Sequence, residues 1–359
     1  MRFPRLDLIA VAFSLAVSAS AQKPTQLWSI DLSADQDFHK RLTVLEVSLD
    51  APSINFLSDS QIICYFYDGE KGGYNLSMPP SGYHVLEIGA NNGAFGRKLD
   101  FQPVDDHSRA LPTDDGGFVV FTGKELKKFN NEFAPGVSYP TPREQVGDAL
   151  DRWLVDVAPS LQAILLYYHR PGDPQGRWTW LHTKDLTVVE SFQSSLTAMI
   201  HASDTAAVFD GVGNQQLLPA RKATVICERC DVHFLTNDLL FVDKEKSYDI
   251  QTLAGKQQGA GKLAIQALHF TRAAHATRVA YVTGSYVGWG FPIVTHLTSI
   301  KGKVTVLDWR TNKQVGEINV NEPLVNPSAG LTQMALALSP DGKRLAVLLR
   351  HTLTLYRLP

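Results

Sequence analysis

The sequence of 359 residues contains almost no helical periodicity and no block of like charges. The best candidate for an amphipathic helix is the segment TPREQVGDALDRW, residues 141–153, and this segment is short. Lysine and arginine total 34 against 36 aspartates and glutamates, which gives a net charge of −2. A near-neutral surface without a basic tract is not typical of nucleic-acid-binding proteins, so we expect no nucleic-acid partner.

Local motifs for catalysis and for cofactor binding are also missing. The sequence has no G-x-S-x-G elbow, no phosphate-binding loop and no haem-attachment C-x-x-C-H, because Asp231 and not histidine follows Cys230. The 11 histidines are scattered, without an H-E-x-x-H, H-x-H or H-x-x-H spacing. We therefore expect no cofactor, no local metal site and no catalytic residue that sequence alone can name.

Cysteine is scarce, with three residues at Cys64, Cys227 and Cys230. Cys64 lies in the apolar run QIICYFY and is predicted to be a buried thiol. Cys227 and Cys230 have C-x-x-C spacing, and a structural disulfide is the leading interpretation for an exported protein. Free inert thiols are the second interpretation. A redox or zinc pair is the third, but the flanks are strand-like, no second C-x-x-C exists, and His233 alone is weak support.

The only long apolar run lies at the N-terminus. Arg2 and Arg5 precede the run of residues 8–17, and Ala19-Ser20-Ala21 has the A-x-A pattern of a signal-peptide cleavage site. The run is shorter than the roughly 20 apolar residues that span a bilayer, although an uncleaved anchor is the alternative. We expect residues 1–21 to be a signal peptide, and residues 22–359 to be one secreted or periplasmic domain without a membrane anchor.

What the sequence does contain is a loose repeat of strand-like segments. Short runs of β-branched and aromatic residues alternate with clusters of Gly, Pro, Asn and Asp, as in all-β proteins. The units begin near Ile54, Ala110, Val155, Ala198, Val232, Ala267 and Ala335. Their spacing centres on the repeat of about 40–45 residues of a four-stranded propeller blade. We predict a seven-bladed β-propeller, with six or eight blades as alternatives.

The last two units carry the most specific motifs. Ser339-Pro340-Asp341-Gly342 has the residues of a tight turn, since proline fixes φ and glycine accepts positive φ. The segments LSPDGKRLAVLLRHTLTLYRL and DWRTNKQVGEINV resemble blades of the bacterial WD-repeat and YVTN-type β-propellers. In those proteins an S-P-D-G-K turn joins the first strand of a blade to the second. The resemblance implies a propeller over most of residues 27–358.

The final unit supplies only three strands, near residues 333–338, 345–350 and 352–358. A blade needs four, and the segment QLWSIDL at residues 26–32 can provide the missing one. We predict that this N-terminal strand becomes the outermost strand of the last blade and closes the ring.

Two aromatic segments are candidates for binding. Residues 165–182 carry two pairs of aromatic residues with histidine and arginine between them: Tyr167, Tyr168, His169, Arg170, Trp178 and Trp180. Packing between blades is the favoured interpretation of that segment. The segment 285–300 lengthens the sixth unit and carries Tyr286, Trp289 and Phe291 among glycines. We expect it to lie outside the blade sheets and to contact a ligand, because long connections are often functional.

A propeller can support binding or catalysis, so the fold alone does not decide the function. The leading hypothesis is a monomeric, non-enzymatic scaffold for a protein, peptide or glycan. The alternative is a lactonase-like hydrolase or lyase. It would use a metal or histidine cluster assembled in the central channel from distant units.

Overall fold

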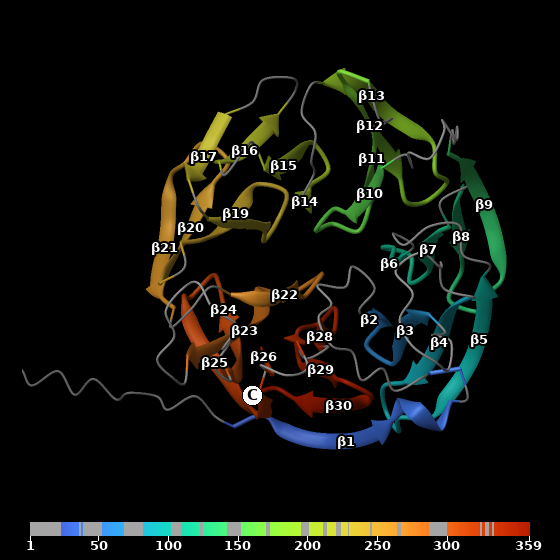
Figure 1. The fold of residues 1–359 in the computed structure, drawn as a ribbon, viewed down its shortest axis with the longest axis vertical. Helices are drawn as coiled ribbons and strands as arrows, with labels where there is room; N and C mark the ends of the chain where they lie inside the picture. The colour runs from blue at the N-terminus through green and yellow to red at the C-terminus, as the bar shows by residue number, and fades with distance from the viewer. Residues whose placement is uncertain are drawn as a thin grey trace, which may run out of the picture.

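The chain folds into a ring of four-stranded antiparallel sheets around a central channel (Figure 1). The computed structural model describes residues 23–35, 37–38, 52–67, 82–101, 109–122, 125–141, 152–169, 173–194, 201–210, 214–219, 224–228, 230–244, 246–263, 267–286, 300–323, 325–326, 330–331 and 334–359. These residues form seven four-stranded sheets and a two-stranded ribbon. The prediction of an all-β propeller with four-stranded blades is confirmed. The expected signal peptide lies outside the described residues.

We number the four-stranded sheets Blade 1 to Blade 7, and in Blades 1 to 6 the strands follow in chain order from the channel to the rim. Blade 1 contains β2 (Ser53–Ser58), β3 (Gln61–Tyr67), β4 (Tyr83–Gly89) and β5 (Phe95–Phe101). Blade 2 contains β6 (Arg109–Pro112), β7 (Phe118–Phe121), β8 (Glu125–Phe129) and β9 (Pro135–Pro140). Blade 3 contains β10 (Arg152–Val157), β11 (Ala163–His169), β12 (Gly176–His182) and β13 (Val188–Ser194).

The remaining blades follow the same plan. Blade 4 contains β14 (His201–Ala202), β15 (Ala206–Asp210), β16 (Asn214–Pro219) and β17 (Thr224–Glu228). Blade 5 contains β18 (Asp231–Phe234), β19 (Leu239–Asp243), β20 (Ser247–Thr252) and β21 (Gln257–Lys262). Blade 6 contains β22 (Leu268–Arg272), β23 (Arg278–Tyr286), β24 (Ile300–Asp308) and β25 (Lys313–Pro323). The ribbon pairs β26 (Val325–Asn326) with β27 (Gly330–Leu331).

Blade 7 is built from both ends of the chain. Its inner strands are β28 (Met334–Leu338), β29 (Arg344–Leu349) and β30 (Thr352–Arg357), and β1 (Thr25–Asp31) is the outermost strand. β1 runs antiparallel to β30, with Thr25 opposite Arg357 and Asp31 opposite Thr352. The blue β1 therefore lies along the rim beside the red β30 (Figure 1). The prediction that an N-terminal strand completes the last blade is confirmed.

The hydrophobic core lies between neighbouring blades rather than in one centre. The second strands of the blades are buried on both faces, which explains their continuous apolar runs. For example, every residue of β7, FVVF, is buried. One face of this strand packs on Blade 3, where Val119 and Phe121 join a cluster with Ile164 and Leu166. The predicted buried thiol of Cys64 is confirmed, and burial raises its pKa.

The turn predicted at Ser339–Gly342 is confirmed. The amide of Gly342 donates to the carbonyl of Ser339 at 2.8 Å, and Gly342 has a φ of 69° that favours glycine. The Ser339 hydroxyl donates to Asp341 Oδ1 at 2.6 Å. The same chemistry recurs in Blade 2, where the Thr113 hydroxyl donates to Asp115 and Gly116 has a φ of 77°.

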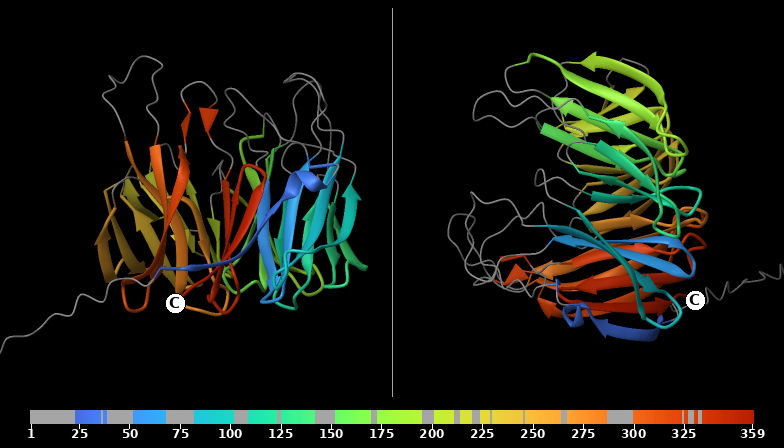
Figure 2. Two further views of the ribbon diagram at one scale, coloured as in Figure 1. Left: turned by 90° about the horizontal axis from the view of Figure 1, so that it is seen from below. Right: turned by 90° about the vertical axis from the view of Figure 1, so that its right-hand side faces the viewer.

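The two faces of the ring differ in the length of their connections. Short turns join the first strand to the second and the third to the fourth, and all of them lie on one face, the turn face. The strand ends that border the longer connections lie on the opposite face, the loop face (Figure 2). These connections are residues 32–52, 68–82, 102–108, 141–151, 195–200, 287–299 and 324–333. The first of them begins with the 3₁₀-helix η1 (Leu32–Ala34).

Three predictions about segment boundaries are corrected by the structure or concern residues that it describes only in part. Residues 285, 286 and 300 belong to β23 and β24, so the ends of the segment 285–300 extend the sheet. Arg152 and Trp153 lie in β10 and pair with β11, so they are not helical; residues 142–151 lie outside the described residues. Unit four begins at His201, and Ala198 is not described.

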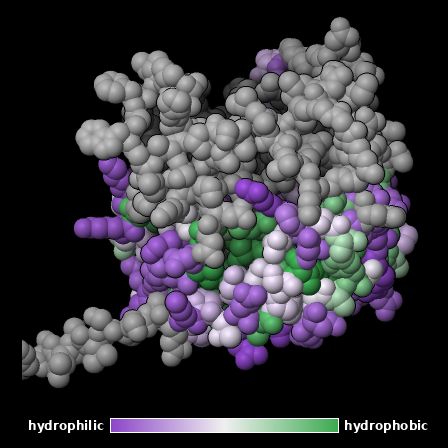
Figure 3. Space-filling view, turned by 60° about the horizontal axis from the view of Figure 1, so that its bottom comes forward, coloured by the Kyte–Doolittle hydropathy of each residue, from purple (hydrophilic) through white to green (hydrophobic). Residues whose placement is uncertain are grey.

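Part of the outer wall of the ring can be seen in Figure 3. The side that faces the viewer in Figure 3 carries hydrophilic residues around smaller hydrophobic groups. In the described part of the chain, no helix has the length and apolar composition needed to cross a bilayer.

Candidate functional site

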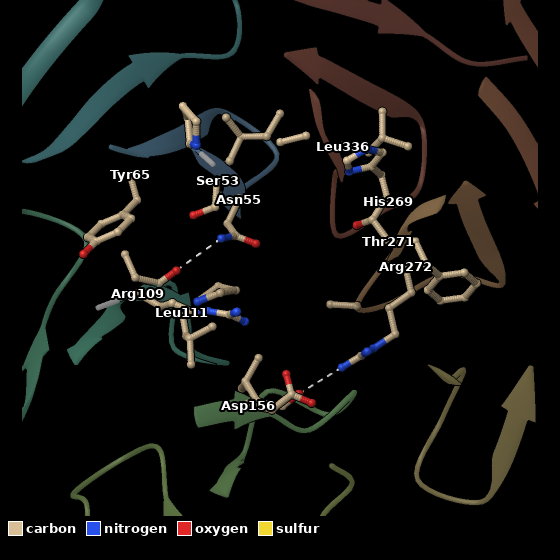
Figure 4. Close-up of a pocket in the computed structure, with 18 of the residues that line it drawn as sticks. Ser53, Asn55, Tyr65, Arg109, Leu111, Asp156, His269, Thr271, Arg272 and Leu336 are labelled. Carbon is tan, nitrogen blue, oxygen red and sulfur yellow. Dashed lines mark hydrogen bonds between the residues drawn. The ribbon is translucent and has the colours of Figure 1, made fainter. Parts of the chain in front are cut away.

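The central channel contains a cavity of about 560 Å³, within the size range of small-molecule sites. The innermost strand of every blade contributes to its wall, namely β2, β6, β10, β14, β18, β22 and β28. Figure 4 shows these strands around the cavity, with the side chains of Asn55, Asp156 and Arg272 among those lining it. The ring therefore brings together residues that are far apart in the sequence.

One carboxylate side chain, Asp156, and two imidazole side chains, His201 and His233, lie in a row across Blades 3, 4 and 5. We call these three residues the channel row. Asp156 Oδ2 lies 3.7 Å from His201 Nδ1, and the rings of His201 and His233 have centroids 4.6 Å apart. The backbone amide of Ala202 also donates to Asp156 Oδ2, at 2.8 Å. Burial alone would raise the pKa of Asp156. The nearby His201 side chain, the positive charge of Arg272 and the hydrogen bond from the Ala202 amide outweigh burial and lower it. Asp156 is therefore a carboxylate at neutral pH.

His233 stands at the end of this row as a neutral ring. Its imidazole stacks on Phe270 with centroids 4.2 Å apart and an interplanar angle of 4°. The buried Nε2 of His233 has no hydrogen-bond partner among the described residues. Burial, followed by the nearness of His201 and of the Arg272 charge, holds the pKa of His233 well below its usual value. His233 therefore contributes a neutral ring to the cavity wall.

Arg272 brings a positive charge to the same wall. Its Nη2 donates to the carbonyl oxygen of Val157 at 3.1 Å, which ties Blade 6 to Blade 3 across the channel. Figure 4 shows the Arg272 side chain extending toward the strand that carries Asp156. Burial lowers the pKa of Arg272 and the charge of Asp156 raises it. In the described chain, no carboxylate lies within ion-pair distance of Arg272.

The charge of the cavity wall is unbalanced. Asp156 is the only acidic residue among those known to line the cavity, whereas Arg109 and Arg272 are cationic. His269 adds a third imidazole to the wall. It has a φ of 51° at an irregularity in the pairing of β22. Such bulges re-aim side chains and are frequent beside functional sites.

The aromatic segment 165–182 proves to be packing, as the favoured interpretation predicted. Trp178 is fully buried, and Tyr167 and Trp180 are 1% and 4% exposed. They form one cluster with Phe209 of Blade 4. Tyr168 and His169 are half-buried, and Arg170 lies outside the described residues.

The residues proposed for binding in segment 285–300 are not brought to the cavity by any described contact. Tyr286 is the last residue of β23, and its side chain is not described. Trp289 and Phe291 lie outside the described residues. A ligand role for these three residues stays a prediction.

Cys227 and Cys230 are linked by a disulfide in the structure. Cys227 belongs to β17, and Cys230 is buried where Blade 4 passes to Blade 5. We predict that the exported protein carries this bridge, with a gain of about 2 kcal/mol because the closed loop is short. Alkylation of the unreduced, denatured protein should modify one thiol, and intact-mass measurement would detect it. Modification of all three cysteines would rule the bridge out.

The sequence analysis kept a histidine cluster in the channel as an alternative but did not name the residues of the channel row, although a weak signal was present. His201, His233 and His269 fall in the innermost strands of three consecutive blades. Histidines that occupy the same strand of successive repeats come close together in space when the repeats form a ring. In the described residues, no group of three His, Cys, Asp or Glu side chains is arranged to hold a metal ion.

Comparison with known proteins supports the fold. No family model matches the chain, and no curated protein matches it either. The chain is similar to the WD40 domain of Neurospora crassa Pan2, with 13% identity and a TM-score of 0.58, over 95% of this chain and 97% of that one. It is also similar to Chaetomium thermophilum Raptor, with 8% identity and a TM-score of 0.57, over 93% of this chain and 29% of that one. These likenesses establish a WD40-like β-propeller fold.

Proposed function

We propose that the protein is an exported, monomeric β-propeller that binds a protein, peptide or glycan on its loop face without catalysing a reaction. The observation that carries this proposal is the asymmetry of the ring. The strand ends that border the longer connections all lie on the loop face, and the described connections on the turn face are short. Long connections on a rigid scaffold are the usual carriers of binding residues.

The finer assignments belong to the same proposal. We assign each of the seven sheets to one blade of a seven-bladed ring, of the bacterial WD-repeat or YVTN type. Trp289 is the proposed anchor for the ligand, together with Tyr286 and Phe291. Tryptophan and tyrosine dominate the energetics of binding surfaces because they bury a large area with little loss of conformational freedom.

The proposal is tested by screening the protein that begins at Gln22 against a glycan array and a displayed peptide library. The best ligand is then titrated against Trp289→Ala. We expect about a thirtyfold loss of affinity, as for a binding hot spot of about 2 kcal/mol. The melting temperature should stay within a few degrees of the unmodified protein.

Lys256→Ala is the matched control, because Lys256 is exposed in the turn between β20 and β21 on the turn face. It should change neither affinity nor melting temperature. A Trp289→Ala variant that loses the several kcal/mol of a core tryptophan and binds as before would make Trp289 a packing residue. That result would remove it from the proposal.

One observation favours the enzymatic alternative. Asp156, His201 and His233 converge in the channel, and a carboxylate beside an imidazole is a common arrangement for proton transfer. A lactonase-like hydrolase would turn over a lactone panel in the presence of added divalent metal, and His201→Ala would abolish the turnover. Equal rates for both proteins would dismiss the channel as an active site.

A further inference from the structure

The Arg272 guanidinium is a cation in the channel wall without a described counter-ion. A guanidinium has five N–H donors, and among the described residues Arg272 makes one hydrogen bond, to the Val157 carbonyl at 3.1 Å. A charge withdrawn from water is costly unless an opposite charge and further hydrogen bonds compensate it. Arg272 lines the cavity, so a ligand there is close to its remaining donors.

Asp156 does not serve as the missing partner. Its Oδ2 accepts the Ala202 amide at 2.8 Å and lies 3.7 Å from His201 Nδ1. This carboxylate therefore ties Blade 3 to Blade 4, and its closest basic side chain is His201. The described wall has no second carboxylate, while Arg109 adds another cation.

Other groups in the wall suit an anion with an organic body. The neutral ring of His233 belongs to this wall. Phe270 stacks on that ring and also lines the cavity. On the opposite side, Tyr65 and Tyr83 stack with centroids 5.4 Å apart. The wall thus combines cationic donors with aromatic surface.

We propose that the central cavity binds a small organic carboxylate, whose carboxylate group accepts hydrogen bonds from Arg272 while its apolar body lies among the aromatic side chains. Arginine suits a carboxylate because its planar fork can donate two parallel hydrogen bonds. The site lies within the channel and does not require a ligand on the loop face. It therefore stands or fails independently of the proposed function.

The test compares carboxylates with their neutral amides on the protein that begins at Gln22. Benzoate and benzamide form one pair, hexanoate and hexanamide the other, and inorganic phosphate is the third kind of probe. Binding is followed by ligand-observed NMR and by calorimetry. Charge-assisted hydrogen bonds are roughly twice as strong as neutral ones, so at least one carboxylate should bind about tenfold more tightly than its amide.

Arg272→Met should weaken that carboxylate about tenfold and leave the amide unchanged, whereas Arg272→Lys should retain part of the difference. Arg310→Met is the matched control, because Arg310 is exposed and lies outside the cavity. If the Arg272 variants do not fold, the difference in affinity between each acid and its amide on the unmodified protein still tests the proposal. The proposal fails if neither carboxylate binds more tightly than its amide, or if phosphate alone binds.

Discussion

A protein trimmed to begin at Ser33 should melt at a lower temperature than the protein that begins at Gln22. Trimming removes β1 with its ladder to β30, and it removes Leu32, which is completely buried in the cluster between Blades 7 and 1. A buried leucine contributes roughly 1.5–3 kcal/mol. Leu27, Trp28 and Ile30 are only half-buried against the same cluster and contribute less.

The total loss is therefore a few kcal/mol, against a domain stability of about 5–15 kcal/mol. At about 2 °C per kcal/mol for a large domain, the melting temperature should fall by roughly 5 °C. Trimming also leaves β30 as an open edge, which invites pairing with other chains. Light scattering during the thermal scan should therefore show aggregation of the trimmed protein at a lower temperature.

Trp28→Ala is the graded control for this experiment. Trp28 Nε1 donates to the Ala90 carbonyl at 3.1 Å and so links β1 to Blade 1. The variant keeps the β1 ladder, so β30 does not become an open edge. It should lose less stability than the trimmed protein. A trimmed protein that remains monomeric and melts with the full one would show that β1 contributes nothing to closure.

Local signals explain why so much of the propeller could be predicted from the sequence. The innermost strand of each blade lies at or within a few residues of a predicted unit start, because tight turns and buried second strands leave strong patterns. The strand that closes the ring could be predicted by counting strands. The last unit has three, a blade needs four, and the N-terminal segment can supply one. The two faces of the ring follow from the same alternation of short and long connections.

Contacts between strands, within a blade and between blades, explain the misses. Trp153 pairs with Tyr168 across the β10–β11 ladder, and this pairing overrides the helical pattern of residues 141–153 at its end. The channel row joins Asp156 of Blade 3, His201 of Blade 4 and His233 of Blade 5, with Arg272 from Blade 6. No spacing within one unit can reveal such a site, because the ring and not the local sequence sets those distances.

Trp178→Ala should produce the largest loss of stability of any single substitution considered. Trp178 is fully buried. The centroid of its ring lies 4.8 Å from that of Tyr167 and 6.3 Å from that of Phe209 in the next blade. Removing a buried tryptophan costs about 3–5 kcal/mol, because a cavity remains where the ring was. Urea denaturation should show a lower midpoint with an unchanged slope.

Two phenylalanine variants separate packing from hydrogen bonding in the same cluster. Trp178 Nε1 has no hydrogen-bond partner among the described residues, so Trp178→Phe should lose only packing. Trp180 Nε1 donates to the Ser203 carbonyl at 3.0 Å, and Trp180→Phe would leave that buried oxygen without this donor. An unsatisfied buried acceptor costs about 1–3 kcal/mol, so Trp180→Phe should be the more harmful of the two. If Trp178→Ala unfolds at the same urea concentration as the unmodified protein, its ring does not hold Blades 3 and 4 together, and the binding interpretation of this segment returns.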